Sequence, residues 1–274
     1  MKKISKVCRP RILKNRKAAS PAVSMVIITA ATVVMILVAS TYALQLLIQQ
    51  QASSEFSTVQ KSFLSFDDAV RDIAFDRGGS RSVRFTASFG HLFLLEGNKT
   101  FEITESSLGY NPEPFTTAVI KYSMPYTLSS LSESPYILGD EKAIVSSLTE
   151  SASQVFVKQE SGSANIFLNY RIRVNAEGTS HKMLNSSITV NYVDIFVIRL
   201  ICTSSFVGNS DFDLVCKNVN LETMQSGIYN VPSNGQITLS AIVDGVPSGQ
   251  VDIDLTAGQK VIFNLIRADV RVDI

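Results

Sequence analysis

The sequence of 274 residues contains no tryptophan, only two histidines and only three cysteines. His91 and His181 have no cysteine or histidine at the spacing of metal ligands, and Cys202 and Cys216 lack the C-x-x-C spacing of zinc and redox sites. A glycine-rich phosphate loop, a G-x-S-x-G elbow and an H-E-x-x-H motif are also absent. We therefore expect no cofactor, no metal site and no enzymatic activity. One alternative to this expectation is an extracytoplasmic enzyme whose site is built from scattered residues.

Charged side chains are absent between Ala18 and Ser54. The segment from Ala22 to Ile48 would form a helix of about 40 Å, which is long enough to cross a hydrocarbon core of about 30 Å. This segment is longer than the apolar core of an ordinary secretory signal, and Thr41-Tyr42-Ala43 is a poor cleavage site. The segment therefore predicts a membrane-spanning helix that stays in the protein.

The basic residues are distributed unevenly. Residues 1–18 hold eight lysines and arginines and no acidic residue. The rest of the chain therefore has 25 − 8 = 17 basic residues against 24 acidic ones, a net charge of −7. Basic residues on the N-terminal flank of a span predict that residues 1–18 are cytoplasmic and that the following domain is extracellular. The acidic remainder argues against a nucleic-acid partner, because phosphate contacts need clustered lysine and arginine.

The sequence Lys17-Ala18-Ala19-Ser20 directly precedes the apolar segment. A basic residue followed by small residues, before a long apolar helix and after a basic leader, resembles the class III signal peptide of archaeal type IV pilins and archaellins. The following Ser20-Pro21 is similar to the opening of archaeal pilin N-termini. The resemblance covers roughly residues 9–75. The early acidic residue of bacterial type IV pilins is absent here, which favours the archaeal branch.

This resemblance implies that a leader peptidase cuts between Ala18 and Ala19 and leaves the apolar helix on the mature protein. It also implies that the helix can pack against copies of itself or other pilin-like subunits in a filament. An uncleaved single-pass anchor is the alternative.

A second helical pattern follows the apolar segment. Apolar residues recur at intervals of three and four, at Phe56, Val59, Phe63, Phe66, Val70 and Ile73. The pattern predicts one helix from Pro21 to Phe75, ended by Gly78-Gly79. Asp67, Asp68 and Asp72 are assigned to a solvated face of this helix, with a cation site as the alternative.

From Arg81 onward the periodicity changes to two residues. The segments RSVRFTA, HLFLLEG and TFEIT predict a three-stranded meander, and short strands separated by turn signals continue to the C-terminus. The fold class that we expect is α+β, a long N-terminal helix followed by an antiparallel β-sandwich head. The expected parts are a leader (1–18), a transmembrane or filament-core helix (19–49), an amphipathic stalk (50–77) and the head (78–274). A split of the head near 105–142 is left open, and we favour a single domain.

Several residues of the head are candidates for modification or binding. Cys202 and Cys216 could form a disulfide outside the cell or be two separate buried thiols. Asn98 and Asn185 lie in N-x-S/T sequons and could be glycosylated. Two pairs are assigned to solvent-facing strand positions, Asp252 with Asp254 and Asp269 with Asp273, and the pair Asp211 and Asp213 could bind calcium in a loop.

Together these patterns predict a non-enzymatic, membrane-anchored surface protein. The resemblance implies a minor type IV pilin-like subunit that serves in the assembly of a cell-surface filament or in adhesion. The alternative is an uncleaved membrane anchor that carries a β-sandwich module for binding a ligand or a surface layer.

Overall fold

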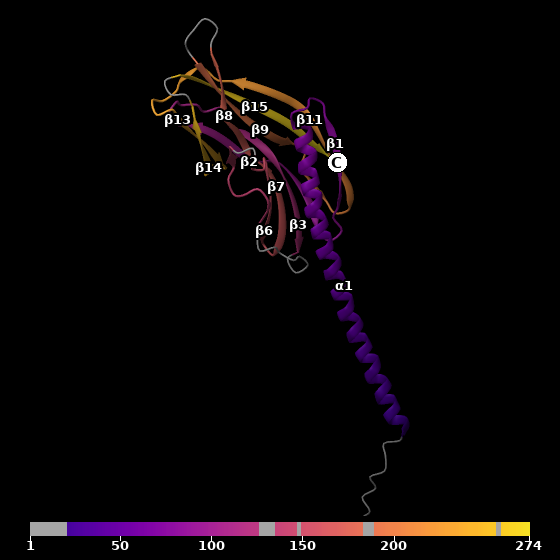
Figure 1. The fold of residues 1–274 in the computed structure, drawn as a ribbon. Helices are drawn as coiled ribbons and strands as arrows, with labels where there is room; N and C mark the ends of the chain where they lie inside the picture. The colour runs from indigo at the N-terminus through magenta and orange to yellow at the C-terminus, as the bar shows by residue number, and fades with distance from the viewer. Residues whose placement is uncertain (1–20, 126–134, 147–148, 183–188, 256–258) are drawn as a thin grey trace, which may run out of the picture. The chain divides into compact units, whose positions relative to one another are not determined.

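The computed structural model describes residues 21–125, 135–146, 149–182, 189–255 and 259–274 (Figure 1). It shows one long N-terminal helix followed by a β-rich domain, so the α+β class is confirmed. The contacts divide the chain into two compact units between Ile48 and Gln49. Residues from Gln49 to Ile274 belong to one unit, which contains the whole head.

Helix α1 runs from Pro21 to Ala74. Pro21 suits a first helical position, because the proline nitrogen has no hydrogen to leave unpaired. Up to Ile48, every side chain whose exposure the structure describes is exposed. Hydroxyl groups here bond to carbonyls of the preceding turn, as Thr29 does to Met25 and Thr41 to Val38. These bonds satisfy polar groups within the helix, which an apolar medium requires.

From Ala52 to Ala74 the same helix buries the predicted apolar stripe. Asn218 of the head donates its side-chain amide to the carbonyls of Ile73 and Ala74, and so satisfies the end of the helix. The chain then turns at Gly78, whose φ of 80° is in the left-handed region that glycine tolerates. The predicted end of the helix is therefore correct within one residue.

The head contains two sheets. The first has the strand order β1 (Ser80–Thr86), β11 (Asp211–Gln225), β15 (Lys260–Asp273), β9 (Thr189–Ile201), β8 (Ile172–Lys182) and β5 (Ile144–Val145), with β12 (Tyr229–Asn230) paired to β15. The second has the order β14 (Val246–Asp254), β13 (Gln236–Val243), β2 (His91–Glu105), β3 (Phe115–Pro125), β7 (Ser163–Tyr170), β6 (Ser153–Glu160) and β4 (Tyr136–Leu138), with β10 (Phe206–Gly208) paired to β2.

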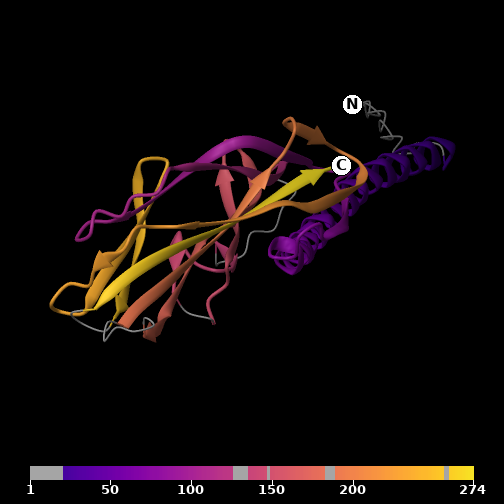
Figure 2. The same cartoon turned by 90° about the horizontal axis from the view of Figure 1, so that it is seen from above.

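The predicted N-terminal meander is wrong. Strand β1 pairs with β11, more than a hundred residues away, and not with β2. The segments HLFLLEG and TFEIT are one strand, β2, whose register against β3 shifts between Leu95 and Lys99. The expectation of purely antiparallel pairing also needs correction, because β15 runs parallel to β9 and β5 runs parallel to β8. Strand β15 runs through the middle of the first sheet (Figure 2).

Two hydrophobic clusters form the core of the head. The first joins the stripe of α1 to residues of both sheets, and the second joins the two sheets without the helix. The central strands serve both clusters with opposite faces. In β15, the residues that belong to the second cluster are Val261, Phe263 and Leu265. Those that belong to the first cluster are Ala268, Val270 and Val272. Strand β9 makes the same change of face between Val197 and Ile198. Both strands are therefore apolar at neighbouring positions.

Candidate membrane segment and anchoring contacts

The largest exposed apolar surface of the described chain belongs to helix α1. Large apolar side chains between Val23 and Ile48 have 45% to 71% of their surface exposed. One helix in the described residues is long and apolar enough to cross a membrane, and this segment is part of it. Burial of such side chains in hydrocarbon is worth about 25 cal/mol per Å² of apolar surface. The segment therefore has the chemistry of a single membrane span.

Glu55, the first charged residue after the apolar segment, holds the helix to the head. Its carboxylate accepts hydrogen bonds from the backbone N–H groups of Ser88 and Phe89, at 2.9 and 3.0 Å, and from the Tyr122 hydroxyl at 2.6 Å. Only 9% of the residue is exposed. Burial, followed by the bond to Glu55, raises the pKa of Tyr122, so this phenol remains a hydrogen-bond donor.

The sequence did not single out Glu55 for any role. A signal was nevertheless present, because Glu55 lies four residues before Val59 and eight before Phe63, on the side of the helix that carries the apolar stripe. A carboxylate at that position is buried together with the apolar stripe unless the stripe is interrupted, and a buried carboxylate needs hydrogen-bond donors. It finds three donors in the head, and so marks the point where the helix enters the core.

Asp67 corrects the prediction that all three carboxylates of the stalk face solvent. Its side chain is completely buried, whereas Asp68 and Asp72 are exposed. The residue lies four positions after Phe63 and three before Val70, and the buried face is wide enough to include it because both sheets contribute to the cluster around the helix. Arg71 Nε lies 3.0 Å from its Oδ2. Burial raises the pKa of Asp67 despite this ion pair and the nearby Ser153 and Tyr170.

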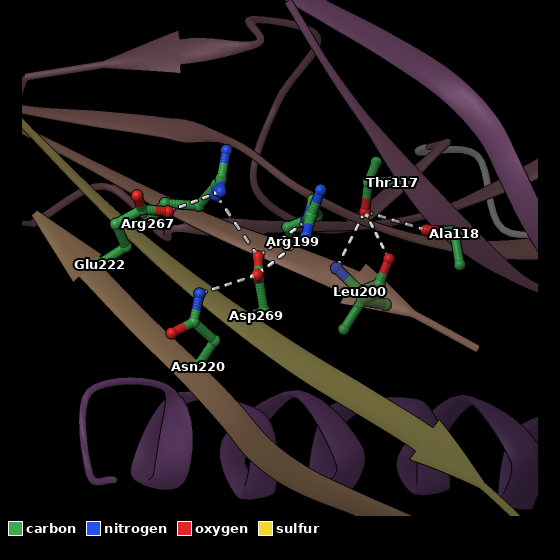
Figure 3. Close-up of polar contacts among 8 residues, drawn as sticks. All are labelled: Thr117, Ala118, Arg199, Leu200, Asn220, Glu222, Arg267 and Asp269. Carbon is green, nitrogen blue, oxygen red and sulfur yellow. Dashed lines mark hydrogen bonds and ion pairs between the residues drawn. The ribbon is translucent and has the colours of Figure 1, made fainter. Parts of the chain in front are cut away.

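Asp269 corrects a second prediction of solvent exposure. The residue is 4% exposed, and its carboxylate forms a two-pronged ion pair with Arg199, at 2.7 and 2.8 Å (Figure 3). Arg267 lies 3.5 Å from Asp269 and also pairs with Glu222 at 2.7 Å. Because Ala268 and Val270 point into the helix-containing cluster, Asp269 points to the opposite face of β15.

This ionic network lies where the central strands change faces. Beside it, Thr117 of the second sheet accepts a hydrogen bond of 3.0 Å from the backbone N–H of Leu200 in the first sheet (Figure 3). The network and this bond supply partners to most polar groups at the junction of the two clusters; Nε of Arg267 is buried and has no hydrogen-bond acceptor among the described residues. Their role is structural, because a bidentate arginine–carboxylate pair neutralises both charges.

The structure brings Cys202 and Cys216 to opposite sides of one strand. Cys216 pairs with Val272 of β15, and Ile201 pairs with Arg271 of the same strand from the other side. Two strand spacings amount to about 10 Å, whereas the Cα atoms of a disulfide lie roughly 4.4–6.8 Å apart. Both thiols are free and buried, and burial raises the pKa of each. The possible disulfide between them is therefore not formed.

The remaining candidates are spread over the surface or lie outside the described residues. Asn98 is exposed in β2, where the strand shifts register, so its sequon is accessible. Asn185 and the expected cleavage residues Lys17, Ala18, Ala19 and Ser20 lie outside the described residues. Asp252 and Asp254 are exposed, as predicted.

The described part of the chain holds no group of three or more histidine, cysteine, aspartate or glutamate side chains arranged to hold a metal ion. Asp211 instead pairs with Arg84 at 3.2 Å.

Comparison with known proteins adds no relative: no family model, no curated protein and no solved structure matches this chain.

Proposed function

We propose that the chain is a membrane-anchored surface protein, a type IV pilin-like subunit, with a β-sandwich head outside the cell. The observation that carries this proposal is the change in burial along one helix. Large apolar side chains are exposed up to Ile48, and the apolar stripe is buried from Ala52. A helix of this kind has one half suited to lipid or to sister helices and another half suited to a protein core.

In this proposal a leader peptidase removes residues 1–18, and the apolar helix first sits in the membrane. The helix then exchanges lipid neighbours for other pilin-like helices, so that the heads cover the surface of a filament. The exposed Asn98 sequon supports an extracellular head that can be glycosylated. The protein acts by adhesion or assembly and carries out no reaction.

The second candidate function is that of an uncleaved single-pass anchor carrying a binding module. The compact head supports this candidate equally well, because a large, well-packed domain suits display of a binding surface. The two candidates differ in the N-terminus of the mature chain.

The experiment is an intact-mass and N-terminal sequence measurement on protein extracted from membranes of the native host. A chain that begins at Ala19 is the result expected for a pilin-like subunit. A chain that retains Cys8 supports the uncleaved anchor and contradicts the first candidate. Ala18→Trp should block processing, because a bulky ring replaces the small residue before the cut. Ala39→Trp, a change to the same residue type within the apolar helix, is the matched control and should be processed normally.

A further inference from the structure

A pocket of about 410 Å³ opens beside the C-terminal end of α1, against strands β8 and β9. Its volume falls in the range of small-molecule sites, roughly 300–1,000 Å³. Its lining combines three arginines with apolar side chains, namely Arg71, Arg171, Arg173, Phe75, Phe196 and Ile198. No carboxylate belongs to this lining among the residues that the structure describes. The pocket thus has an apolar wall and a rim of arginines, of which Arg71 pairs with Asp67 and Asp68 and Arg171 pairs with Asp140, all outside the lining.

The apolar wall is formed by two aromatic rings from different elements. Phe75 follows the last residue of α1, and its ring meets that of Phe196 edge to face, with centroids 5.6 Å apart. Phe75 is nevertheless 43% exposed. Phe196 is the direct cross-strand partner of Arg173, so one aromatic ring and one guanidinium are fixed side by side by the register of β8 and β9. A ligand with both an apolar body and an anionic group would match this pair.

Arg171 supplies a buried cation whose hydrogen-bonding capacity is incompletely used. Its side chain is 1% exposed, and Nη1 forms an ion pair of 2.9 Å with Asp140, a partly exposed carboxylate. Its Nε is buried and has no acceptor among the described residues. A buried donor without a partner is unusual enough to need an explanation.

The backbone approaches the buried guanidinium of Arg171 closely at a glycine. Gly139 has a φ of 77°, and a Cβ atom there would lie 2.9 Å from Nη2 of Arg171 and 2.6 Å from the Ser153 carbonyl oxygen. Gly139 and Arg171 both line an adjoining pocket of about 510 Å³, whose other charged lining residues are Arg71, Arg173, Asp140 and Glu150. A side chain at this position would therefore clash with the guanidinium and the carbonyl oxygen, so the glycine lets the backbone pack directly against Arg171.

We propose that the arginine-rimmed pocket binds a small organic acid. The carboxylate lies against the guanidinium groups of Arg171 and Arg173, and the apolar body lies against Phe75 and Phe196. Arginine suits this role because its planar fork matches a carboxylate and keeps its charge at all physiological pH values. An added carboxylate also offers an acceptor to the buried Nε of Arg171, which the ion pair with Asp140 leaves without one among the described residues. This site goes beyond the proposed function and does not depend on whether the N-terminal helix anchors or assembles.

The test is ligand-observed ¹⁹F NMR on the full chain in detergent micelles, with 4-fluorobenzoate as the probe. We expect its signal to broaden with the protein and to sharpen again when excess benzoate is added. The cation 4-fluorobenzylamine, which has a similar ring and the opposite charge, should show no such protein-dependent broadening. Equal broadening of both probes, or of neither, would overturn the proposal.

Two variants locate the binding. Arg173→Gln should weaken 4-fluorobenzoate binding about tenfold, as expected for one charge-assisted hydrogen bond. Phe75→Ala should weaken it as well and changes a side chain that is 43% exposed and lies outside the buried core, so folding should be preserved even if Arg173→Gln proves unstable. Arg84→Gln removes an arginine on β1 outside the pocket lining and is the matched control. If Arg84→Gln weakens binding as much as the pocket variants, or if neither pocket variant weakens it, the site is not this pocket.

Discussion

At the scale of single residues, three of the four buried carboxylates in the described part of the chain show how a charge is accommodated in the core. Glu55, Asp67 and Asp269 are each at most 9% exposed. A buried charge is costly unless it is paired and hydrogen-bonded. Glu55 meets this requirement with backbone N–H groups and a phenol, and Asp269 meets it with a two-pronged arginine. Asp67 has only one well-placed partner, Arg71, and one of its oxygens has no partner among the described residues.

Replacement of Glu55 should loosen the join between the helix and the head. Glu55→Ala leaves two backbone N–H groups and the Tyr122 hydroxyl without an acceptor, so we expect a loss of about 3 kcal/mol in the free energy of unfolding. Urea unfolding of the full chain in micelles, followed by near-ultraviolet circular dichroism, measures the loss. Glu113→Ala changes an exposed glutamate and is the control. An equal, small effect of both variants would show that the Glu55 bonds contribute nothing.

Asp67 should make the head less stable as the pH rises. Burial raises its pKa in the folded protein above the ordinary value of 3.8. The folded state therefore holds the proton more tightly than the unfolded state, and the stability that this provides is lost as the pH rises through the raised pKa. Asp67→Asn removes this titration, so the stability of the parent relative to the variant should fall between about pH 4 and about pH 7.

Urea unfolding of both proteins at the two pH values measures this difference. Asp68→Asn, at an exposed neighbour that also pairs with Arg71, is the control and should leave the pH dependence nearly unchanged. A parent that gains stability relative to Asp67→Asn as the pH rises would contradict the prediction.

At the scale of elements, the amphipathic half of α1 belongs to the core of the head. Phe63 is fully buried and meets Phe85 of β1 edge to face, with ring centroids 5.6 Å apart. Phe63→Ala should cost about 3–5 kcal/mol, because it removes a large buried side chain and leaves a cavity. Thermal unfolding of the full chain in micelles measures the cost, with Lys61→Ala on the exposed face as the control. If Phe63→Ala unfolds at the same temperature as Lys61→Ala, this helix segment does not stabilise the head.

The central strands β9 and β15 contain neighbouring apolar residues, although a half-buried strand usually alternates between apolar and polar residues. In β9 and β15 both residue parities are buried, because each strand contributes one face to the first cluster and the opposite face to the second. The alternation therefore shifts by one residue part-way along each strand, which in β9 places the two buried residues Val197 and Ile198 next to each other. Charged residues occur at the change of face, where Arg199 and Asp269 neutralise each other.

At the scale of the whole molecule, the apolar segment should decide where the protein resides. Leu37 is 60% exposed in the middle of this segment. An arginine at the centre of a membrane span costs about 3 kcal/mol relative to leucine. Leu37→Arg should therefore release a larger share of the protein from membranes in alkaline carbonate extraction, while Leu37→Ile should behave as the parent does. Unchanged retention of Leu37→Arg would argue against a membrane span at this position.

The sequence by itself determined those helices and strands whose pattern involves residues close together in the chain. Spacings of three and four predicted the helix to within one residue of its end, because the apolar stripe reflects the helical period and Gly78 supplies the turn that follows. Alternation also located strands of the head, such as β1, whose bounds Ser80–Thr86 lie within one residue of the predicted segment RSVRFTA. The exposed positions of Asp252 and Asp254 followed from alternation with buried Val251 and Ile253.

Only the tertiary structure decided which strands pair and which faces are covered. The pairing of β1 with β11 and the parallel pairing of β9 with β15 join segments far apart in the chain, and no local pattern encodes the partner. Asp67 and Asp269 looked solvent-facing because a periodic pattern indicates which residues share a face of their own element. It does not indicate what covers that face: Asp67 lies where both sheets surround the helix, and Asp269 is covered by arginines of its own strand and the neighbouring strand.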